Sequence, residues 1–486
     1  MLKQRALSAT LWSGADILLR QGLQFVITIV LAHLLSPSEF GTIALLVLFT
    51  GIATVFVDGG FSAALIQRQD VNHNDESTVF WFNLCIGAVV ALGLWAAAPA
   101  IARFYAQPIL VPLMVVLALN VFLGALGAIH ATLLTKRLDF RTQMKIGVVA
   151  TLVSGSIAIW MAWKGYGVWS LAAQAIGMTT VTTTLLWLFN HWYPNLSFSR
   201  ASARKLFGFG GYHLGSSLLE IIYVRLYTVL VGRFYGVREL GFYNNADNTK
   251  QLPAGFLTNV LSRVAFPMFS EAAEDKVKLR RGMQLAVRGT MLLNAPMMLG
   301  MAAVAEPLVR TLFGAQWLAA VPILRVLCLA GLLWPLHVLN LNVLMAQGHS
   351  RLMFRLEVTK KVIGVVLLCV GALYGVLGIA WSQVVFSVMA FTINAYYTWR
   401  FLDYGIGAQL RDFWALLCIA AVMSAIVYLA SVAWHATPAV ELIGLVVLGA
   451  VIFLTTVWLL RLAAVQDVVT LFRRMPTNPL DRAKSA

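Results

Sequence analysis

Ionisable side chains interrupt several long apolar runs of this sequence, where each of them is costly and therefore informative. The cations inside such runs are Arg20, Arg225, Lys250, Arg263 and Arg325. A cation at the centre of a hydrocarbon layer costs about 2.5 to 3.5 kcal/mol on insertion scales, so residues of this kind face a protein interior or a watery cavity. Buried cations of this kind are suited to binding an anionic ligand. These residues are therefore the first candidates for a ligand site.

The stretch SGADILLRQGLQF, residues 13–25, indicates how such side chains are arranged. Ser13, Asp16, Arg20 and Gln24 are spaced by three and four residues, so a helix places them on one stripe. Asp16 and Arg20 at i and i+4 are able to neutralise each other, and a structural salt bridge is the alternative to a ligand contact. We take Arg20 and Gln24 as candidate substrate-binding residues and Asp16 as a candidate ion-coupling residue.

Arg225 differs from this pair because no acid stands at helical spacing from it. Glu220 lies five residues away and so points to another part of the helix surface. A cation held in a cavity without an anion is a site that an anionic ligand completes. The sequence therefore favours a binding role for Arg225 over a structural one.

The remaining candidates carry simpler alternatives. Lys250 stands about two turns into its run, beside Asp247, and Arg263 and Arg325 lie near the ends of their runs, where long side chains also reach the membrane interface. Asp58 precedes Gly59 and Gly60, a position that suits either a coupling proton or the cap of a broken helix. The candidate ion-coupling residues are Asp16, Asp58, Glu220 and Asp247.

The elements that must position these side chains are membrane-spanning helices. Of the 486 residues, 60% are hydrophobic and 12% are charged, whereas soluble domains are about a quarter charged. Apolar runs of roughly 20 residues, which cross about 30 Å of hydrocarbon, recur along the chain, while barrel strands would alternate over roughly ten residues. We predict an all-α polytopic membrane protein with about 14 transmembrane helices, at residues 11–34, 39–65, 79–103, 108–133, 142–163, 166–192, 208–235, 243–268, 283–306, 319–345, 354–373, 376–402, 410–434 and 438–462.

The formal net charge of +16 reports orientation and not a nucleic-acid partner. Most of the 36 Lys and Arg residues, with Lys360 counted among them, fall in the loops of one side and in the two termini. This asymmetry is the positive-inside rule, so both termini are predicted to be cytoplasmic.

No catalytic constellation, cofactor motif or metal site emerges from the sequence. The acids are dispersed, and no Gly-rich loop for phosphates is present. The cysteines, Cys85, Cys328, Cys369 and Cys418, are scattered singly inside predicted spans, which indicates neither a disulfide framework nor a zinc site.

An internal repeat divides the chain into two halves. LAHLLSPSEFGTI at residues 31–43 is echoed by VGRFYGVRELGFY at residues 231–243, so that Glu39 and Gly41 fall on Glu239 and Gly241. Two lobes of six spans each follow, related by a pseudo-twofold axis along the membrane normal, and two such lobes with a site between them form an alternating-access layout. A duplicated but static scaffold is the alternative. The predicted divisions are an N-lobe at 1–192, an interfacial cytoplasmic connector at 193–207, a C-lobe at 208–405, two extra helices at 406–462 and a cytoplasmic tail at 463–486.

The connector has a composition suited to the membrane surface. Residues 193–209, YPNLSFSRASARKLFGF, mix Leu and Phe with Arg and Lys, which predicts an interfacial helix on anionic headgroups.

Several stretches together resemble one family. LAHLLSPSEFGTIAL, FVDGGFSAALIQRQD, AAPAIARFYAQPIL, KRLDFR, KGYGVWSL, ELGFYNNADN and VAFPMFSE are similar to the signature stretches of bacterial polysaccharide transporters. These are the Wzx-type flippases of the multidrug/oligosaccharidyl-lipid/polysaccharide (MOP) exporter superfamily, in the branch of colanic-acid and other exopolysaccharide exporters. The resemblance implies a V-shaped fold of two six-helix lobes plus two extra helices. It covers about three quarters of the chain.

The resemblance also implies a function in the bacterial inner membrane. Members of the family move undecaprenyl-diphosphate-linked oligosaccharide repeat units across this membrane for exopolysaccharide, O-antigen or capsule synthesis, beside membrane lipids and the polysaccharide polymerase or export machinery. Their cavity is typically cationic, which points to Arg20, Arg225 and Lys250 in this chain. Where relatives often carry an acid in span seven, this chain reads YVRLYTVLVGR, with Tyr227 and Thr228, and a coupling-ion role for this helix is therefore in doubt.

Two other functions fit parts of the sequence. A cation-coupled multidrug antiporter of the same superfamily would favour acids in its cavity, and here the cations within spans at least match the acids. A membrane polymerase or ligase acting on lipid-linked glycans would show a large outer loop with catalytic residues, and every predicted outer loop is short. The sequence therefore favours a flippase that works by alternating access.

Overall fold

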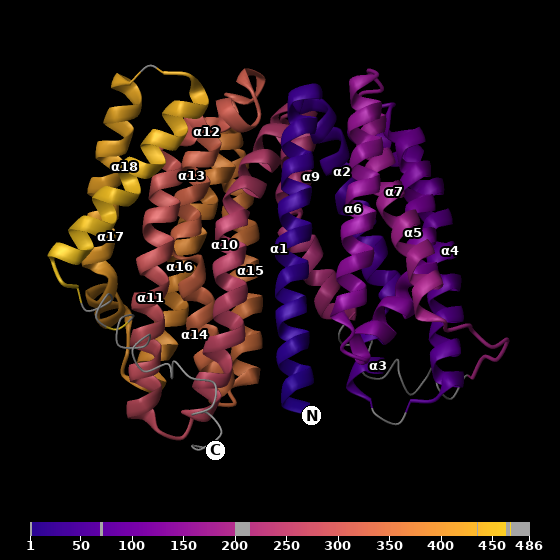
Figure 1. The fold of residues 1–486 in the computed structure, drawn as a ribbon, viewed down its shortest axis with the longest axis horizontal. Helices are drawn as coiled ribbons and strands as arrows, with labels where there is room; N and C mark the ends of the chain where they lie inside the picture. Colours follow the sequence, from indigo (N-terminus) through magenta and orange to yellow (C-terminus); the bar gives the residue numbers. More distant parts are fainter. Residues whose placement is uncertain (1, 69–70, 200–213, 435, 463–466, 468–486) are drawn as a thin grey trace. The chain divides into compact units, whose positions relative to one another are not determined.

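The computed structural model describes residues 2–68, 71–199, 214–434, 436–462 and 467, and these residues form helices joined by short turns, with no strand among them (Figure 1). The chain divides into two compact units, Met1–Gly241 and Phe242–Ala486. The all-helical membrane fold predicted from the sequence is therefore confirmed.

The first unit is a bundle of long helices in which α4 packs on α5, α6 on α7 and α1 on α6. Its helices are α1 (Leu2–Leu34), α2 (Pro37–Asp58), α3 (Phe61–Gln67), α4 (His73–Phe104), α5 (Leu110–Lys136), α6 (Phe140–Trp163), α7 (Val168–Asn190) and α9 (Leu226–Phe234). Helix α9 is the second part of the candidate span Leu214–Phe234. The unit extends beyond the predicted N-lobe because this span packs on α2, where an added Cβ at Gly51 would lie 3.3 Å from Ile221.

The second unit holds the remaining helices, with α17 and α18 side by side at its edge (Figure 1). They are α10 (Val237–Glu271), which begins in the first unit, α11 (Lys276–Ala303), α12 (Ala305–Leu312), α13 (Ala320–Leu332), α14 (Trp334–Ala346), α15 (Ser350–Ala372), α16 (Gly375–Leu402), α17 (Ile406–Ala433) and α18 (Pro438–Leu459). One apolar core of this unit is built by residues of α10, α11, α14, α16, α17 and α18.

Fewer helices qualify as membrane spans, by their length and composition, than the fourteen predicted. Among the described residues, 11 helices qualify as membrane spans, or 12 if α11 and α12, which meet at 74°, form one bent span. Helices α10 and α15 coincide with predicted spans but do not qualify, because their polar and charged residues leave no stretch of sufficient apolarity and low charge. The count of fourteen therefore stays a prediction.

Turn chemistry fixes the helix ends of the first unit. The backbone N–H of Ser36 donates to the Glu39 carboxylate over 2.6 Å, which closes a capping box at the start of α2. Helix α2 ends at Asp58 because Gly59 and Gly60 both adopt a left-handed conformation, with φ of 54° and 74°. The predicted break after Asp58 is therefore confirmed.

The repeated stretches of the sequence meet inside the first unit. A Cβ added to Gly41 would lie 1.7 Å from the Val237 carbonyl oxygen, and one added to Gly241 would lie 1.9 Å from the Pro37 carbonyl oxygen. The first turns of α2 and α10 thus approach backbone to backbone through two equivalent glycines. Only glycine permits this approach at either position.

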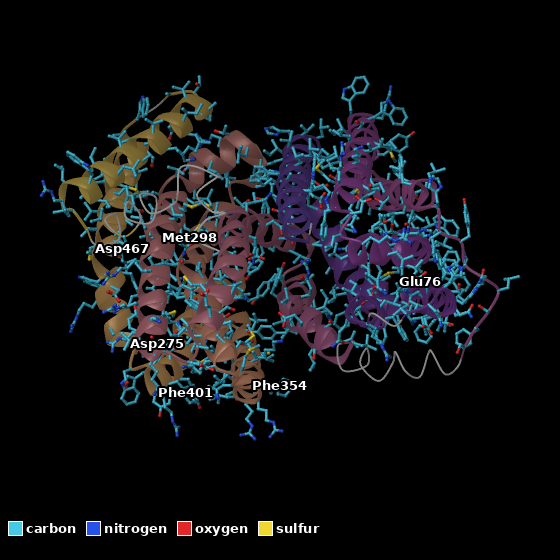
Figure 2. The ribbon with its side chains drawn as sticks, turned by 60° about the horizontal axis from the view of Figure 1, so that its bottom comes forward. Glu76, Asp275, Met298, Phe354, Phe401 and Asp467 are labelled. Carbon is cyan, nitrogen blue, oxygen red and sulfur yellow. The ribbon has the colours of Figure 1, made fainter. Side chains whose placement is uncertain are left out.

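The start of the predicted connector is extended and not helical. Residues 193–199 lie along α4, where the Asn195 N–H donates to Ser77 Oγ over 3.0 Å and the Trp192 ring N–H donates to Glu76 over 2.8 Å. Figure 2 labels Glu76 in this unit. The predicted interfacial helix is therefore wrong over 193–199, because Pro194 and these bonds hold the chain extended, and residues 200–209 of it lie outside the described residues.

Candidate substrate-binding site

The Asp16–Arg20 pair on α1 forms as the sequence predicts. Arg20 Nη2 donates to Asp16 Oδ2 over 2.7 Å, and the side chains are 43% and 9% exposed, respectively. Helix α1 packs on α6, where Gly147 makes room for the arginine: an added Cβ would lie 2.4 Å from Arg20 Cδ. Gln24, one turn further along, is exposed. Of the residues on the predicted stripe, Asp16 and Arg20 therefore neutralise each other, and the amide of Gln24 is exposed.

Arg225 marks a distortion inside the span Leu214–Phe234. Its φ of −98° and ψ of 4° separate residues 214–224 from α9, and its carbonyl accepts from the Thr228 N–H over 3.0 Å, which is the tighter spacing of a 3₁₀ turn. The Nε atom of its guanidinium is buried and has no hydrogen-bond partner among the described residues. Within that part of the chain no carboxylate pairs with Arg225, as the spacing from Glu220 predicts. Glu220 itself is exposed.

Lys250 and Asp247 form a pair on one turn of α10. The Lys250 ammonium lies 2.7 Å from Asp247 Oδ1, and the two side chains are largely buried. The aliphatic part of Lys250 lies against Gly331 of α13, where an added Cβ would meet its Cγ and Cδ at 3.4 Å. The predicted binding residue Lys250 is therefore neutralised by a predicted ion-coupling residue.

A helix break lies beside this pair, between α13 and α14. Asn294 of α11 donates through Nδ2 to the Leu332 carbonyl over 2.7 Å, and Ser387 of α16 donates to the Ala330 carbonyl over 2.9 Å. Backbone carbonyls freed inside a membrane need internal partners of this kind. The sequence interpretation missed Asn294 and Ser387. An amide inside an apolar run, two residues before Pro296, was the available signal for Asn294.

A second acid–lysine pair lies on α15. Lys360 is almost fully buried and donates to Glu357, three residues earlier. The sequence interpretation placed Lys360 among the loop cations, which is wrong, because helix α15 carries it into the packed interior. The spacing of three residues, which Asp247 and Lys250 share, was the available signal.

The other candidates are separated from these pairs. The Arg325 guanidinium lies over the Tyr428 ring, 5.2 Å from its centroid, which is a cation–π contact between α13 and α17. Asp58 is half-buried at the end of α2, with no hydrogen bond or ion pair to a described residue. The side chain of Arg263 lies outside the described residues.

An apolar cavity of about 870 Å³ opens in the second unit between α11, α17 and α18. Its walls include Pro296, Gly300, Met423, Gly449 and Phe453. Gly300 and Gly449 keep this space free, because added Cβ atoms there would already touch Met423 and Val427 at 3.3 to 3.5 Å. The cavity offers a long apolar ligand a place among helices that are themselves exposed to lipid.

Long apolar helices that carry ion pairs inside the bundle define a multi-pass membrane protein. The family model described as "Polysaccharide biosynthesis protein" matches residues 30–322, and the model described as "Lipid II flippase MurJ" matches residues 221–448. The chain belongs to the polysaccharide biosynthesis protein family.

Individual relatives agree with this assignment. The chain is 28% identical to the teichuronic acid biosynthesis protein TuaB of Bacillus subtilis (strain 168), over 88% of this chain and 89% of TuaB. It is 27% identical to the lipopolysaccharide biosynthesis protein WzxC of Escherichia coli (strain K12), over 82% of this chain and 81% of WzxC.

Solved structures establish the fold. A structure of the lipid II flippase MurJ in an inward closed conformation has a TM-score of 0.76 at 15% identity, over 93% of this chain and 99% of that one. An inward-facing multidrug resistance MATE family transporter of the MOP superfamily has a TM-score of 0.61 at 16% identity, over 80% of this chain and 99% of that one. The predicted MOP fold is therefore confirmed.

Proposed function

We propose that this protein moves undecaprenyl-diphosphate-linked oligosaccharide repeat units across the bacterial inner membrane by alternating access. The transported units would serve exopolysaccharide, O-antigen or capsule synthesis. Family membership, relatives named for polysaccharide synthesis and the fold of a lipid II flippase support this proposal.

The observation that carries the proposal is Arg225. An isolated ion in a medium of low dielectric constant costs tens of kcal/mol by Born estimates, so a diphosphate needs fixed positive charge along its route. A guanidinium is always protonated and binds phosphate oxygens through two parallel hydrogen bonds. Arg225 lies within a candidate span, its Nε is buried, and the described residues offer it no carboxylate. A diphosphate would supply the missing acceptor.

The paired cations rank below Arg225 as phosphate ligands. Arg20 and Lys250 each contact an acid of their own helix at 2.7 Å. A phosphate oxygen must displace that carboxylate or share the cation with it, which removes part of the gain. We assign these pairs to shaping the route, with Asp16 and Asp247 as the carboxylates available to exchange a coupling ion.

The apolar cavity suits the prenyl chain of the substrate. Its walls are nearly free of polar groups, and it lies beside lipid-exposed faces of α17 and α18. A lipid tail bound there would keep its hydrocarbon out of water while the headgroup crosses.

Orientation and partners complete the proposal. The charge asymmetry supports cytoplasmic N- and C-termini, and the polysaccharide polymerase or export machinery would receive the translocated unit.

A multidrug antiporter of the same superfamily is the second candidate, supported by the MATE likeness. Arg225 argues against it, because an unpaired arginine repels cationic drugs.

The test is deletion of the gene in its native host, followed by complementation and analysis of lipid-linked intermediates. Arg225→Ala is expected to lower export about 10- to 100-fold and to leave the repeat unit on the inner leaflet, since a hydrogen bond to a charged group contributes roughly 1.5–3 kcal/mol. Arg225→Lys should recover part of the export because it keeps the charge.

Arg233→Ala is the matched control, because Arg233 is exposed at the end of the same span and lies over the Phe104 ring. Normal export by Arg225→Ala would remove this residue from the site. Normal export by the deletion strain would overturn the proposed function itself.

A further inference from the structure

A pocket of about 370 Å³ lies at the turn between α16 and α17, far in sequence from the residues of the proposed transport route. Tyr396 and Trp399 form one wall, and Asp403, Gly405 and Gly407 form the other. Helices α16 and α17 are consecutive candidate spans of 28 residues each, about 42 Å at 1.5 Å per residue. Because that length exceeds the hydrocarbon layer of about 30 Å, the turn that joins them lies in the headgroup region.

Two aromatic side chains line this pocket. Tyr396 and Trp399 are about half exposed, and their ring centroids lie 5.9 Å apart with the planes inclined by 50°. Such a corner of two rings presents negative ring faces to a cation. Gly405 allows the turn to pass directly over the base of the indole, because an added Cβ would lie 2.8 Å from Trp399 Cβ.

A carboxylate completes the pocket. Asp403 is exposed with φ of 53°, and among the described residues no hydrogen bond or ion pair involves its side chain. Its backbone N–H donates to the Trp399 carbonyl over 2.8 Å, which fixes the carboxylate close to the rings. A carboxylate beside two aromatic faces is the arrangement that recognises an ammonium group.

Hydrogen bonds from buried side chains hold the turn between α16 and α17. Tyr404 is fully buried and donates to Asp412 Oδ2 over 2.6 Å, and Gln409 donates to the Tyr404 carbonyl over 3.2 Å. Burial, reinforced by the bond to Asp412, raises the pKa of Tyr404, so the phenol remains a donor. Figure 2 shows Phe401, which precedes the turn, at the same end of this unit as Phe354 and Asp275. The backbone of the turn that lines the pocket is therefore held by contacts within the protein.

Positive charge flanks the pocket on both helices. Arg400 stands four residues after Tyr396, and Arg411 four residues after Gly407, so each shares a helix face with a pocket residue. Both arginines are exposed. One carboxylate in the pocket and two arginines beside it complement a zwitterion whose ammonium group is followed by a phosphate.

We propose that Tyr396, Trp399 and Asp403 form a binding site for the ammonium headgroup of a zwitterionic phospholipid such as phosphatidylethanolamine, with Arg400 and Arg411 facing its phosphate. A sugar is the less suitable occupant, since a neutral glycan needs several donors and acceptors and would gain nothing from the flanking arginines. This site is independent of the proposed transport of lipid-linked glycans.

The experiment is a lipid titration of the purified full-length protein in detergent micelles, followed by native mass spectrometry. The probes are phosphatidylethanolamine and, separately, anionic phosphatidylglycerol. We expect the first to bind more tightly, and we expect Asp403→Asn and Trp399→Leu each to weaken it about tenfold, as the loss of a cation–π or charged contact implies. Binding of phosphatidylglycerol should not change in these variants.

Gly407→Phe gives a test that removes no existing contact. A Cβ at Gly407 would meet nothing within 4 Å, so the new ring has room and should occupy the pocket. It is expected to block phosphatidylethanolamine as strongly as Asp403→Asn. Trp163→Leu is the matched control for a general interfacial role, because Trp163 is an exposed tryptophan at the end of α6.

Equal binding of the two lipids, or unchanged binding in all the pocket variants, would overturn the site. Displacement of the lipid by neutral sugars would overturn it as well, because it would reassign the pocket to glycan binding. Transport assays of the pocket variants are separate from this titration, so failure of either proposal leaves the other intact.

Discussion

Each unit of the molecule contains a distorted span with charged residues nearby. The two spans differ in which of their polar and charged groups have partners. In the second unit, the break between α13 and α14 receives hydrogen bonds from Asn294 and Ser387, and Lys250 next to it is paired with Asp247. In the first unit, the span distorted at Arg225 leaves a buried Nε without a partner among the described residues. The hydrogen-bonded carbonyls and the paired lysine stabilise the first of these sites, whereas a cation without an acid is available to an anionic ligand.

The largest expected effect compares the unpaired cation with a paired one. Arg225→Gln should lower export about 10- to 100-fold, because a charged hydrogen-bond donor to the substrate is lost. The double variant Glu306→Gln/Arg310→Gln removes both charges of an exposed pair in the second unit and should keep most of the export. Complementation assays at matched protein levels measure both. A double variant as inactive as Arg225→Gln would end the distinction between the two units.

The next effect concerns stability in the second unit. Arg288 donates through Nε to Asp412 over 2.9 Å and through Nη1 to Asp467 over 3.2 Å. Asp412→Ala leaves a largely buried arginine and the Tyr404 hydroxyl short of an acceptor, so unfolding should become easier by about 3 kcal/mol. Thermal unfolding in detergent measures the loss. Glu306→Ala breaks the exposed pair with Arg310 and should cost under about 1 kcal/mol.

A smaller loss is expected at the α13–α14 break. Asn294→Ala removes the donor to the Leu332 carbonyl and should destabilise the protein by roughly 1–3 kcal/mol, the cost of an unsatisfied buried acceptor. The exposed Asn248 is a suitable control, since Asn248→Ala should change little. Equal unfolding temperatures for the two variants would mean that the break does not depend on Asn294.

The smallest effect is expected for the pair on α1. Arg20 is 43% exposed, so Asp16→Asn should cost under about 1 kcal/mol of stability. The same thermal assay applies. A loss of several kcal/mol would show that this pair stabilises the fold as strongly as the buried pairs of the second unit.

Much of the fold could be predicted from the sequence because lipid imposes length and composition on every span. The break after Asp58 was also predictable, since two consecutive glycines leave few other conformations. The α13–α14 break was not, because it depends on donors from Asn294 and Ser387, which come from other helices. The extended start of the connector at 193–199 depends in the same way on side chains of α4.

The candidate site was predictable only in part. The pairing of Asp16 with Arg20 follows from helical spacing alone, and so does the lack of a local acid for Arg225. Lys360 shows the limit, because a lysine among other cations of the chain suits a loop count, yet packing of α15 buries it beside Glu357. Spacing along one helix does not report which neighbours surround it.

The sequence by itself therefore determined the membrane class, the helices and the local charge pairs, because these depend on interactions within about one turn or on the thickness of the bilayer. The tertiary structure decided which polar groups are satisfied, as at the Leu332 carbonyl, Lys360 and the Tyr404 hydroxyl. Such satisfaction depends on atoms brought together from distant parts of the chain, and only packing sets those distances.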